Sequence, residues 1–116
     1  MSLQPIPPDW CKTVCELLRK GGPRLVTFEP KGRMRWEAEF PSGMMYELEK
    51  AFRDTLSQPG VAGCPVQMSF PTGDTWDFYF TYKGHKLYGK ILLYPAKNKV
   101  LIFSAHHPDK PTLRCE

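Results

Sequence analysis

The residues with the clearest chemical potential lie in the last third of the chain. Residues 86–90 read KLYGK, so Lys86, Tyr88 and Lys90 share one face if the segment is a β-strand, in which successive side chains alternate. Lysine neutralises phosphate, and a tyrosine between two lysines can stack on a base or bond to a phosphate. The spacing predicts an anion-binding face, although an ordinary solvent-exposed strand also carries alternating lysines.

Two histidines follow an apolar segment further along, at His106 and His107. RNA strand cleavage needs a base for the 2′-hydroxyl proton, cations for the charge on phosphorus, and an acid for the leaving 5′-oxygen. Tyr88, Lys90 and a histidine can fill these roles without a metal ion. Adjacent strand residues face opposite ways, so only one of His106 and His107 joins this face, and a one-residue change of register exchanges them.

Basic charge is concentrated in the same part of the chain, although the formal net charge of the whole is only +4. Between residues 83 and 114 a single acid, Asp109, stands against seven basic residues: Lys83, Lys86, Lys90, Lys97, Lys99, Lys110 and Arg114. Such segregation favours an anionic partner, and the cleavage chemistry described above would make that partner RNA. All of these basic residues except Lys90, which is assigned a catalytic role, are expected to contact the nucleic acid.

The sequence contains no signature of a cofactor or a metal site. It has no phosphate-binding loop, dinucleotide-binding glycine motif or paired-histidine metalloprotease motif. The cysteines Cys11, Cys15, Cys64 and Cys115 lack zinc-ribbon spacing and are predicted to be reduced thiols, partly buried. No apolar run is long enough to cross a membrane, and the first ten residues lack a signal core, so a cytoplasmic protein is expected.

Two helices are predicted from apolar residues at helical spacing. The first runs from about Trp10 to Lys20, with Asp9 as N-cap and Gly21-Gly22-Pro23 as its stop. The second runs from about Met44 to Ser57. Residues 1–8 are expected to form an extended lead-in and residues 108–116 a tail.

The strands are predicted from alternating or continuous apolar residues between turn signals. They are Arg24–Glu29, Arg33–Phe40, Val66–Phe70, Trp76–Tyr82, Lys86–Tyr94 and Val100–Ala105, the last placed centrally, with residues 58–65 as a loop. The order α-β-β-α-β-β-β-β predicts a single α+β domain over residues 1–116. Its sheet would be antiparallel, with five or six strands and the two helices packed on one side.

The segment GDTWDFYFTYKGHKLYGKILLYPAKNKVLIFSAHHPDK resembles the C-terminal sheet of small bacterial ribonuclease toxins of the RelE and MqsR types. In those families one strand often opens with a tryptophan and an acid, and the next carries a tyrosine and a basic residue. An apolar strand with a polar, basic end follows. Here Trp76-Asp77, Tyr88-Gly89-Lys90-Ile91 and residues 100–106 occupy those places.

The resemblance implies a cytoplasmic endoribonuclease that cleaves mRNA, either free or on the ribosome, without a metal ion and is neutralised by a cognate antitoxin. It implies that Tyr88 and Lys90 contact the phosphate and the transition state, and that His106 or His107 acts as acid or base. Lys83 and Lys86 would guide the RNA backbone.

Two other functions are compatible with the same residues. A small, aromatic-rich α+β chain without a catalytic signature is also typical of a phage or mobile-element protein that inhibits a host nucleic-acid-processing complex through a basic face. The third alternative is a protein-interaction module whose lysines only keep it soluble. The three functions predict RNA cleavage, binding without cleavage, and neither.

Overall fold

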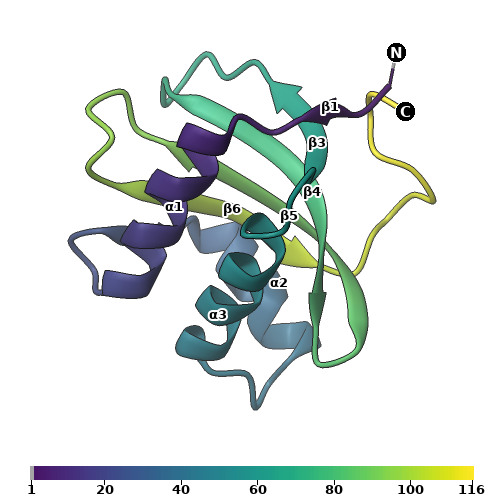
Figure 1. Ribbon diagram of the computed structural model, residues 1–116. Helices are drawn as coiled ribbons and strands as arrows, with labels where there is room; N and C mark the ends of the chain where they lie inside the picture. The colour runs from purple at the N-terminus through teal and green to yellow at the C-terminus, as the bar shows by residue number, and fades with distance from the viewer. Residues whose placement is uncertain (1) are drawn as a thin grey trace.

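The computed structural model describes residues 2–116 and has an α+β architecture, with three helices and a six-stranded sheet within those residues (Figure 1). The helices are α1 (Pro8–Lys20), α2 (Pro30–Glu39) and α3 (Met45–Leu56). The strands are β1 (Gln4–Pro5), β2 (Val26–Phe28), β3 (Ala62–Val66), β4 (Asp74–Tyr82), β5 (His85–Leu93) and β6 (Val100–His106). None of the helices in this range has the length and apolar character needed to span a bilayer.

The strands lie in the order β1-β3-β4-β5-β6-β2, and β2 runs parallel to β6 while the other neighbours are antiparallel. The predicted α+β class is therefore confirmed, whereas the predictions of two helices and a wholly antiparallel sheet were wrong. The predicted interior position of the last strand agrees with β6, which lies between β5 and β2.

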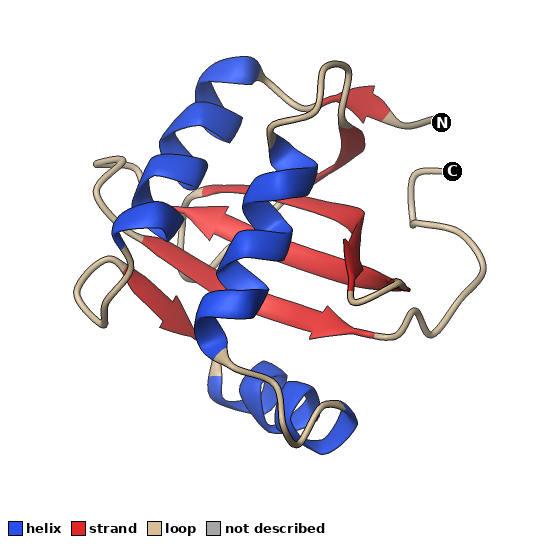
Figure 2. Cartoon of the chain, turned by 60° about the horizontal axis from the view of Figure 1, so that its bottom comes forward, coloured by secondary structure: helices blue, strands red, loops and turns tan. Residues whose placement is uncertain are grey.

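Helices α1 and α3 lie side by side across one face of the sheet (Figure 2). Their apolar stripes are buried there, and Phe52 of α3 packs its ring 4.3 Å from that of Phe80 and 5.9 Å from that of Phe78 on β4. Opposite Phe78, β5 carries Gly89, where a Cβ atom would come within 2.8 Å of the Phe52 ring. Glycine at this position lets α3 approach the sheet closely.

The segment predicted as the strand Arg33–Phe40 is helix α2 instead. Its alternation of apolar and charged residues is misleading, because the charges pair at helical spacing, Arg33 with Glu37 and Arg35 with Glu39. The preceding residues Glu29-Pro30-Lys31-Gly32 start this helix. Glu29 caps it by accepting hydrogen bonds from two backbone N–H groups, and Pro30 takes the first position.

In the predicted extended lead-in, residues 4–5 form β1 and α1 starts at Pro8, while residue 1 lies outside the described residues. Three further predictions, of a loop, a strand and reduced cysteines, were wrong in the outer parts of the fold. Strand β3 begins inside the stretch 58–65 predicted as a loop and ends at Val66, where the predicted strand Val66–Phe70 would have begun. Cys64 of β3 forms a disulfide with Cys115 of the tail, so these two cysteines are not the reduced thiols expected, whereas Cys11 and Cys15 are free.

Strand β6 contains a β-bulge opposite β5. Ile102 pairs with Ile91 and Ser104 pairs with Lys90, so Phe103 is left without a partner on β5. Because side chains alternate along a strand, the extra residue reverses the faces of all residues after it. His106 consequently lies on the face opposite α1 and α3, paired with Tyr88.

Helix α2 packs closely against this bulge. A Cβ atom at Gly32 would collide with the carbonyl oxygen of Phe103, so only glycine lets α2 pack against β6 at this point. The backbone N–H of Glu29 donates to the Ile102 carbonyl at 2.8 Å, beside the bulge. The start of α2 and the bulge therefore fit together as one unit.

Replacing Gly32 with alanine tests this fit. The change normally stabilises a helix interior by about 0.5–1 kcal/mol. Here we expect the free energy of unfolding in urea to fall by about 1–3 kcal/mol, because the added methyl group must displace the backbone of β6. Lys31→Ala, at the exposed neighbouring position, is the control and should change stability by less than about 0.5 kcal/mol. A Gly32→Ala protein as stable as the wild type would contradict the packing described.

Candidate functional site

The sheet face opposite α1 and α3 collects the polar residues of three strands. The register places Lys90 of β5 opposite Asp77 of β4, and Tyr88 of β5 lies between Tyr79 of β4 and His106 of β6. These pairs share a face because directly opposed residues of neighbouring strands point to the same side. We call this surface the distal face.

The C-terminal segment, residues 107–116, forms a wall beside the distal face (Figure 1). Leu113 is buried, and the disulfide ties Cys115 to β3. The carboxylate of Asp109 accepts two hydrogen bonds from the guanidinium of Arg35 on α2, at 2.6 and 3.0 Å. The segment is thus held at both of its ends.

A pocket of about 220 Å³ lies between this wall and the sheet, and we call it the distal pocket. Its lining includes Asp77, Tyr79, Tyr88, His106, Lys110 and Arg114. Carboxylate, phenol, imidazole, ammonium and guanidinium groups therefore surround one small space.

Asp77 is the most deeply buried charged residue of the pocket, with 1% of its surface exposed. Its Oδ2 accepts a hydrogen bond from the Tyr88 hydroxyl at 2.9 Å, whereas its Oδ1 is buried without a hydrogen-bond partner. Burial raises the pKa of Asp77, while the Tyr88 hydrogen bond and the positive charges of Arg114 and Lys90 oppose that rise. Desolvation of the Asp77 carboxylate and the positive charges around it therefore act on its pKa in opposite directions.

Burial and the neighbouring carboxylate also change the acidity of the other strand residues. Tyr88 has a raised pKa, caused by burial and by the nearby Asp77 charge, so its hydroxyl keeps its proton at neutral pH. Lys90 has a lowered pKa, caused by burial and by repulsion from Arg114. A lysine of lowered pKa gives up its proton more readily than an exposed one.

His106 has one of its ring nitrogens fixed by the backbone. Its Nδ1 lies 2.7 Å from the carbonyl oxygen of His107, and because a carbonyl only accepts, Nδ1 carries the proton. In the neutral ring, Nε2 is then the unprotonated nitrogen and is the one able to accept a proton. The ring centroid lies 5.3 Å from that of Tyr88.

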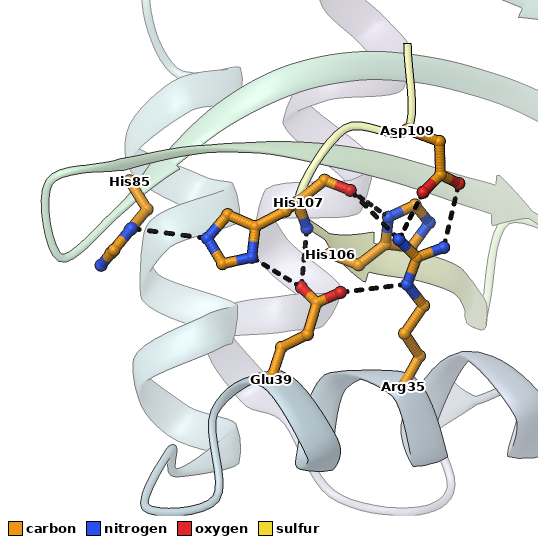
Figure 3. A network of polar contacts seen from close by, with 6 residues as sticks. All are labelled: Arg35, Glu39, His85, His106, His107 and Asp109. Carbon is orange, nitrogen blue, oxygen red and sulfur yellow. Dashed lines mark hydrogen bonds and ion pairs between the residues drawn. The ribbon is translucent and has the colours of Figure 1, made fainter.

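His107 lies in a separate group of polar residues, drawn in Figure 3. Its Nδ1 is 2.9 Å from Oε1 of Glu39 at the end of α2, and its Nε2 is 3.5 Å from Nδ1 of His85. The ring of Phe40 stacks on that of His107, with centroids 5.3 Å apart. The two adjacent histidines thus belong to different groups, and the bulge sets which one joins which: His106 lies toward Tyr88 and His107 toward Glu39.

The residues predicted to contact nucleic acid lie in three different places. Lys110 and Arg114 line the distal pocket, and Lys86 lies next to it with its Nζ 4.1 Å from the centre of the Tyr79 ring. Lys83 instead forms an ion pair of 3.0 Å with Glu47 on α3. Lys97 and Lys99 are in the turn between β5 and β6, at the far end of the strands from His106.

Three residues that shape the site had no functional role in the sequence prediction: Asp77, Arg35 and Glu39. Asp77 had a usable signal, since it is an acid within an apolar strand and carboxylates are seldom buried without a partner. Arg35 and Glu39 had none, because the segment that contains them was predicted as a strand. Their contacts with residues 107–109 join parts of the chain about 70 positions apart.

A larger groove, of about 750 Å³, lies between α1 and the loop that follows α3. It contains the two free thiols, but burial raises the pKa of Cys11 to about 11 and also raises that of Cys15. Thiols that stay protonated are poor nucleophiles and poor metal ligands. The groove therefore has less chemical potential than the distal pocket.

Among residues 2–116 no cluster of three or more His, Cys, Asp or Glu side chains is arranged to hold a metal ion. Comparison of the chain with protein-family models, with curated proteins and with solved structures gave no match. Inference about function therefore rests on the geometry of the distal pocket.

The raised pKa of Asp77 predicts a pH effect on stability. Between the unfolded pKa, about 4, and the higher folded pKa, the native state holds more protons than the unfolded state, so stability falls as pH rises. Asp77→Asn removes this contribution. We expect the variant to gain stability relative to the wild type as pH rises from about 3.5 to 7, measured by urea unfolding at several pH values. A stability difference independent of pH would contradict the assignment.

Proposed function

We propose that this protein is a metal-independent endoribonuclease that cleaves mRNA, with the distal pocket as its active site. The observation that carries the proposal is that His106 and Arg114 line the distal pocket together with the Tyr88–Asp77 pair, while Lys90 lies next to them, opposite Asp77 on the neighbouring strand. This set includes a proton acceptor, a proton donor and fixed positive charge. Those are the groups that transfer of a phosphoryl group to a 2′-hydroxyl requires.

In the proposed reaction, each of the groups His106, Lys90 and Arg114 has one role. His106 Nε2 takes the proton of the 2′-hydroxyl as the 2′-oxygen attacks phosphorus. Lys90, whose pKa is lowered, gives a proton to the 5′-oxygen as the P–O5′ bond breaks, and Arg114 offsets the charge on the phosphorane. The products are a 2′,3′-cyclic phosphate and a 5′-hydroxyl end.

Tyr88 and Asp77 support this arrangement. The Tyr88 hydroxyl is held by Asp77, so its ring keeps a fixed position beside the His106 ring, where it can contact the phosphate or stack on a base. Asp77 draws the cations toward the pocket and limits their mutual repulsion. Lys86 and Lys110 at the margin would guide the RNA backbone, and Lys97, Lys99 and Lys83 would contact more distant nucleotides.

The proposal also includes the compartment in which the enzyme acts and the protein that neutralises it. The enzyme would act in the cytoplasm and be neutralised by a cognate antitoxin, for which the cationic margin of the distal pocket is the expected docking surface. Disulfides are uncommon in the reducing cytosol. With Cys64 and Cys115 reduced, the C-terminal segment would still be held by buried Leu113 and by the Asp109–Arg35 ion pair.

One observation favours the non-catalytic alternative, an inhibitor or binding protein that uses its basic face. Asp77 is almost fully covered, and the pocket between the sheet and the C-terminal segment is small, so a nucleotide enters only if that segment moves. A protein that functions by surface contact alone needs no such movement. It would bind RNA or a host protein and leave RNA intact.

Cleavage of labelled mRNA in the presence of EDTA separates the two functions. The wild type should produce fragments that end in a cyclic phosphate. His106→Ala should slow cleavage about 10²–10⁴-fold, because it removes the general base. The double variant Lys90→Ala, His106→Ala should be inactive.

Lys12→Ala is the matched control, because it removes the same charge as Lys90→Ala from α1, on the other side of the sheet, and should cleave at the wild-type rate. Identical RNA patterns for the wild type and the double variant would exclude the proposed active site. Binding that weakens steeply with salt, without any cleavage, would support the alternative.

A further inference from the structure

The polar group around His107 has a geometry that the ribonuclease proposal does not use. We propose that His85 and His107 together bind a divalent transition-metal ion of the zinc, nickel or copper class, and that Glu39 orients His107 for this purpose (Figure 3). The site lies where the end of α2, the start of β5 and the residue after β6 meet.

The distance between the two candidate ligand atoms fits a metal ion. His107 Nε2 and His85 Nδ1 are 3.5 Å apart. Two imidazole nitrogens that each lie 2.0–2.1 Å from a tetrahedral ion are about 3.3–3.4 Å apart. An ion therefore fits between the rings after a movement of a few tenths of an ångström.

Glu39 fixes the tautomer that His107 needs. Its Oε1 lies 2.9 Å from Nδ1 of His107 and also accepts the backbone N–H of His107 at 2.7 Å. Its Oε2 accepts from Nε of Arg35 at 3.0 Å. Because the carboxylate accepts from Nδ1, the lone pair of the neutral ring is on Nε2, toward His85. Metal-binding histidines are commonly oriented by a carboxylate in this way.

The aromatic ring of Phe40 holds both imidazoles in place. It stacks on His107 with an interplanar angle of 26° and meets His85 edge to face, at a centroid distance of 5.7 Å. Without metal, Nδ1 of His85 carries the proton that is donated to His107. Metal binding moves that proton to Nε2 of His85, a change of tautomer that leaves the net charge of the ring unchanged.

The donor set selects the class of metal. Neutral imidazole suits zinc, copper and nickel, whereas magnesium and calcium prefer oxygen ligands. No third side chain of a suitable type completes the site within residues 2–116, so the remaining positions would be taken by water or by a ligand from another molecule. Lys83, two residues before His85, has its charge balanced by Glu47.

Isothermal titration of the untagged protein with Ni²⁺ and with Zn²⁺ tests the proposal. The wild type should bind one ion saturably, with Mg²⁺ giving no heat, and should melt at a higher temperature in the presence of Ni²⁺. His85→Ala and His107→Ala should each lose this binding. Glu39→Gln should retain the site with an affinity roughly 10–100-fold lower.

His106→Ala is the matched control and should bind Ni²⁺ like the wild type, since His106 belongs to the distal pocket. His85 is exposed, so His85→Ala provides a test that does not depend on the fold tolerating a change at His107. The proposal is overturned if the wild type shows no saturable binding. It is also overturned if His85→Ala binds as tightly as the wild type, which would place the ion elsewhere, for example on Cys11 and Cys15.

Discussion

The β-bulge at Phe103 decides which side chains meet on the distal face. Up to Ile102, strand β6 alternates in register with β5, and one unpaired residue then reverses the alternation. Without that residue His106 would point into the apolar core between the sheet and α3, and His107 would take its place on the distal face. The core keeps Ile102 and Ala105, both fully buried, on either side of the bulge. Gly32 on α2 provides the space that the displaced carbonyl of Phe103 needs.

The distal pocket depends in turn on the compensation of one buried charge by its neighbours. An isolated carboxylate at the buried position of Asp77 would be costly. The positive charges of Arg114 and Lys90 reduce that cost, and burial raises the pKa of Asp77 and lowers that of Lys90. Such perturbed groups in a concave site are typical of functional centres.

Elements whose stabilising contacts are close together in the chain could be predicted, whereas features that depend on residues far apart in the chain could not. Strands β4, β5 and β6 could be predicted, because short turns join them and their apolar periodicity is local. The alignment of Tyr88 with Lys90 followed from that periodicity. The choice between His106 and His107 did not, since it depends on a bulge whose partner, Gly32, lies about 70 residues earlier.

Helix α2 and the C-terminal segment show two other limits of local reasoning. In residues 33–40 the charged and apolar residues fit both a strand and a helix with i,i+4 ion pairs, and packing of Trp36 decided the outcome. The pairing of Cys64 with Cys115 and the burial of Leu113 depend on the tail returning along the sheet to β3, for which the sequence carries no local signal. Asp77 lines a pocket only because the C-terminal segment lies over this part of the sheet.

The central claim is that RNA binds in the distal pocket against His106, and the three histidines offer a direct measurement of it. Imidazole resonances of His85, His106 and His107 would be followed by NMR during titration with a single-stranded 2′-O-methyl RNA, which cannot be cleaved by attack of its 2′-oxygen. We predict that the His106 resonances shift saturably, and that a Lys90→Ala protein shows a weaker response. Unchanged His106 resonances, with or without shifts at His85 and His107, would contradict the claim.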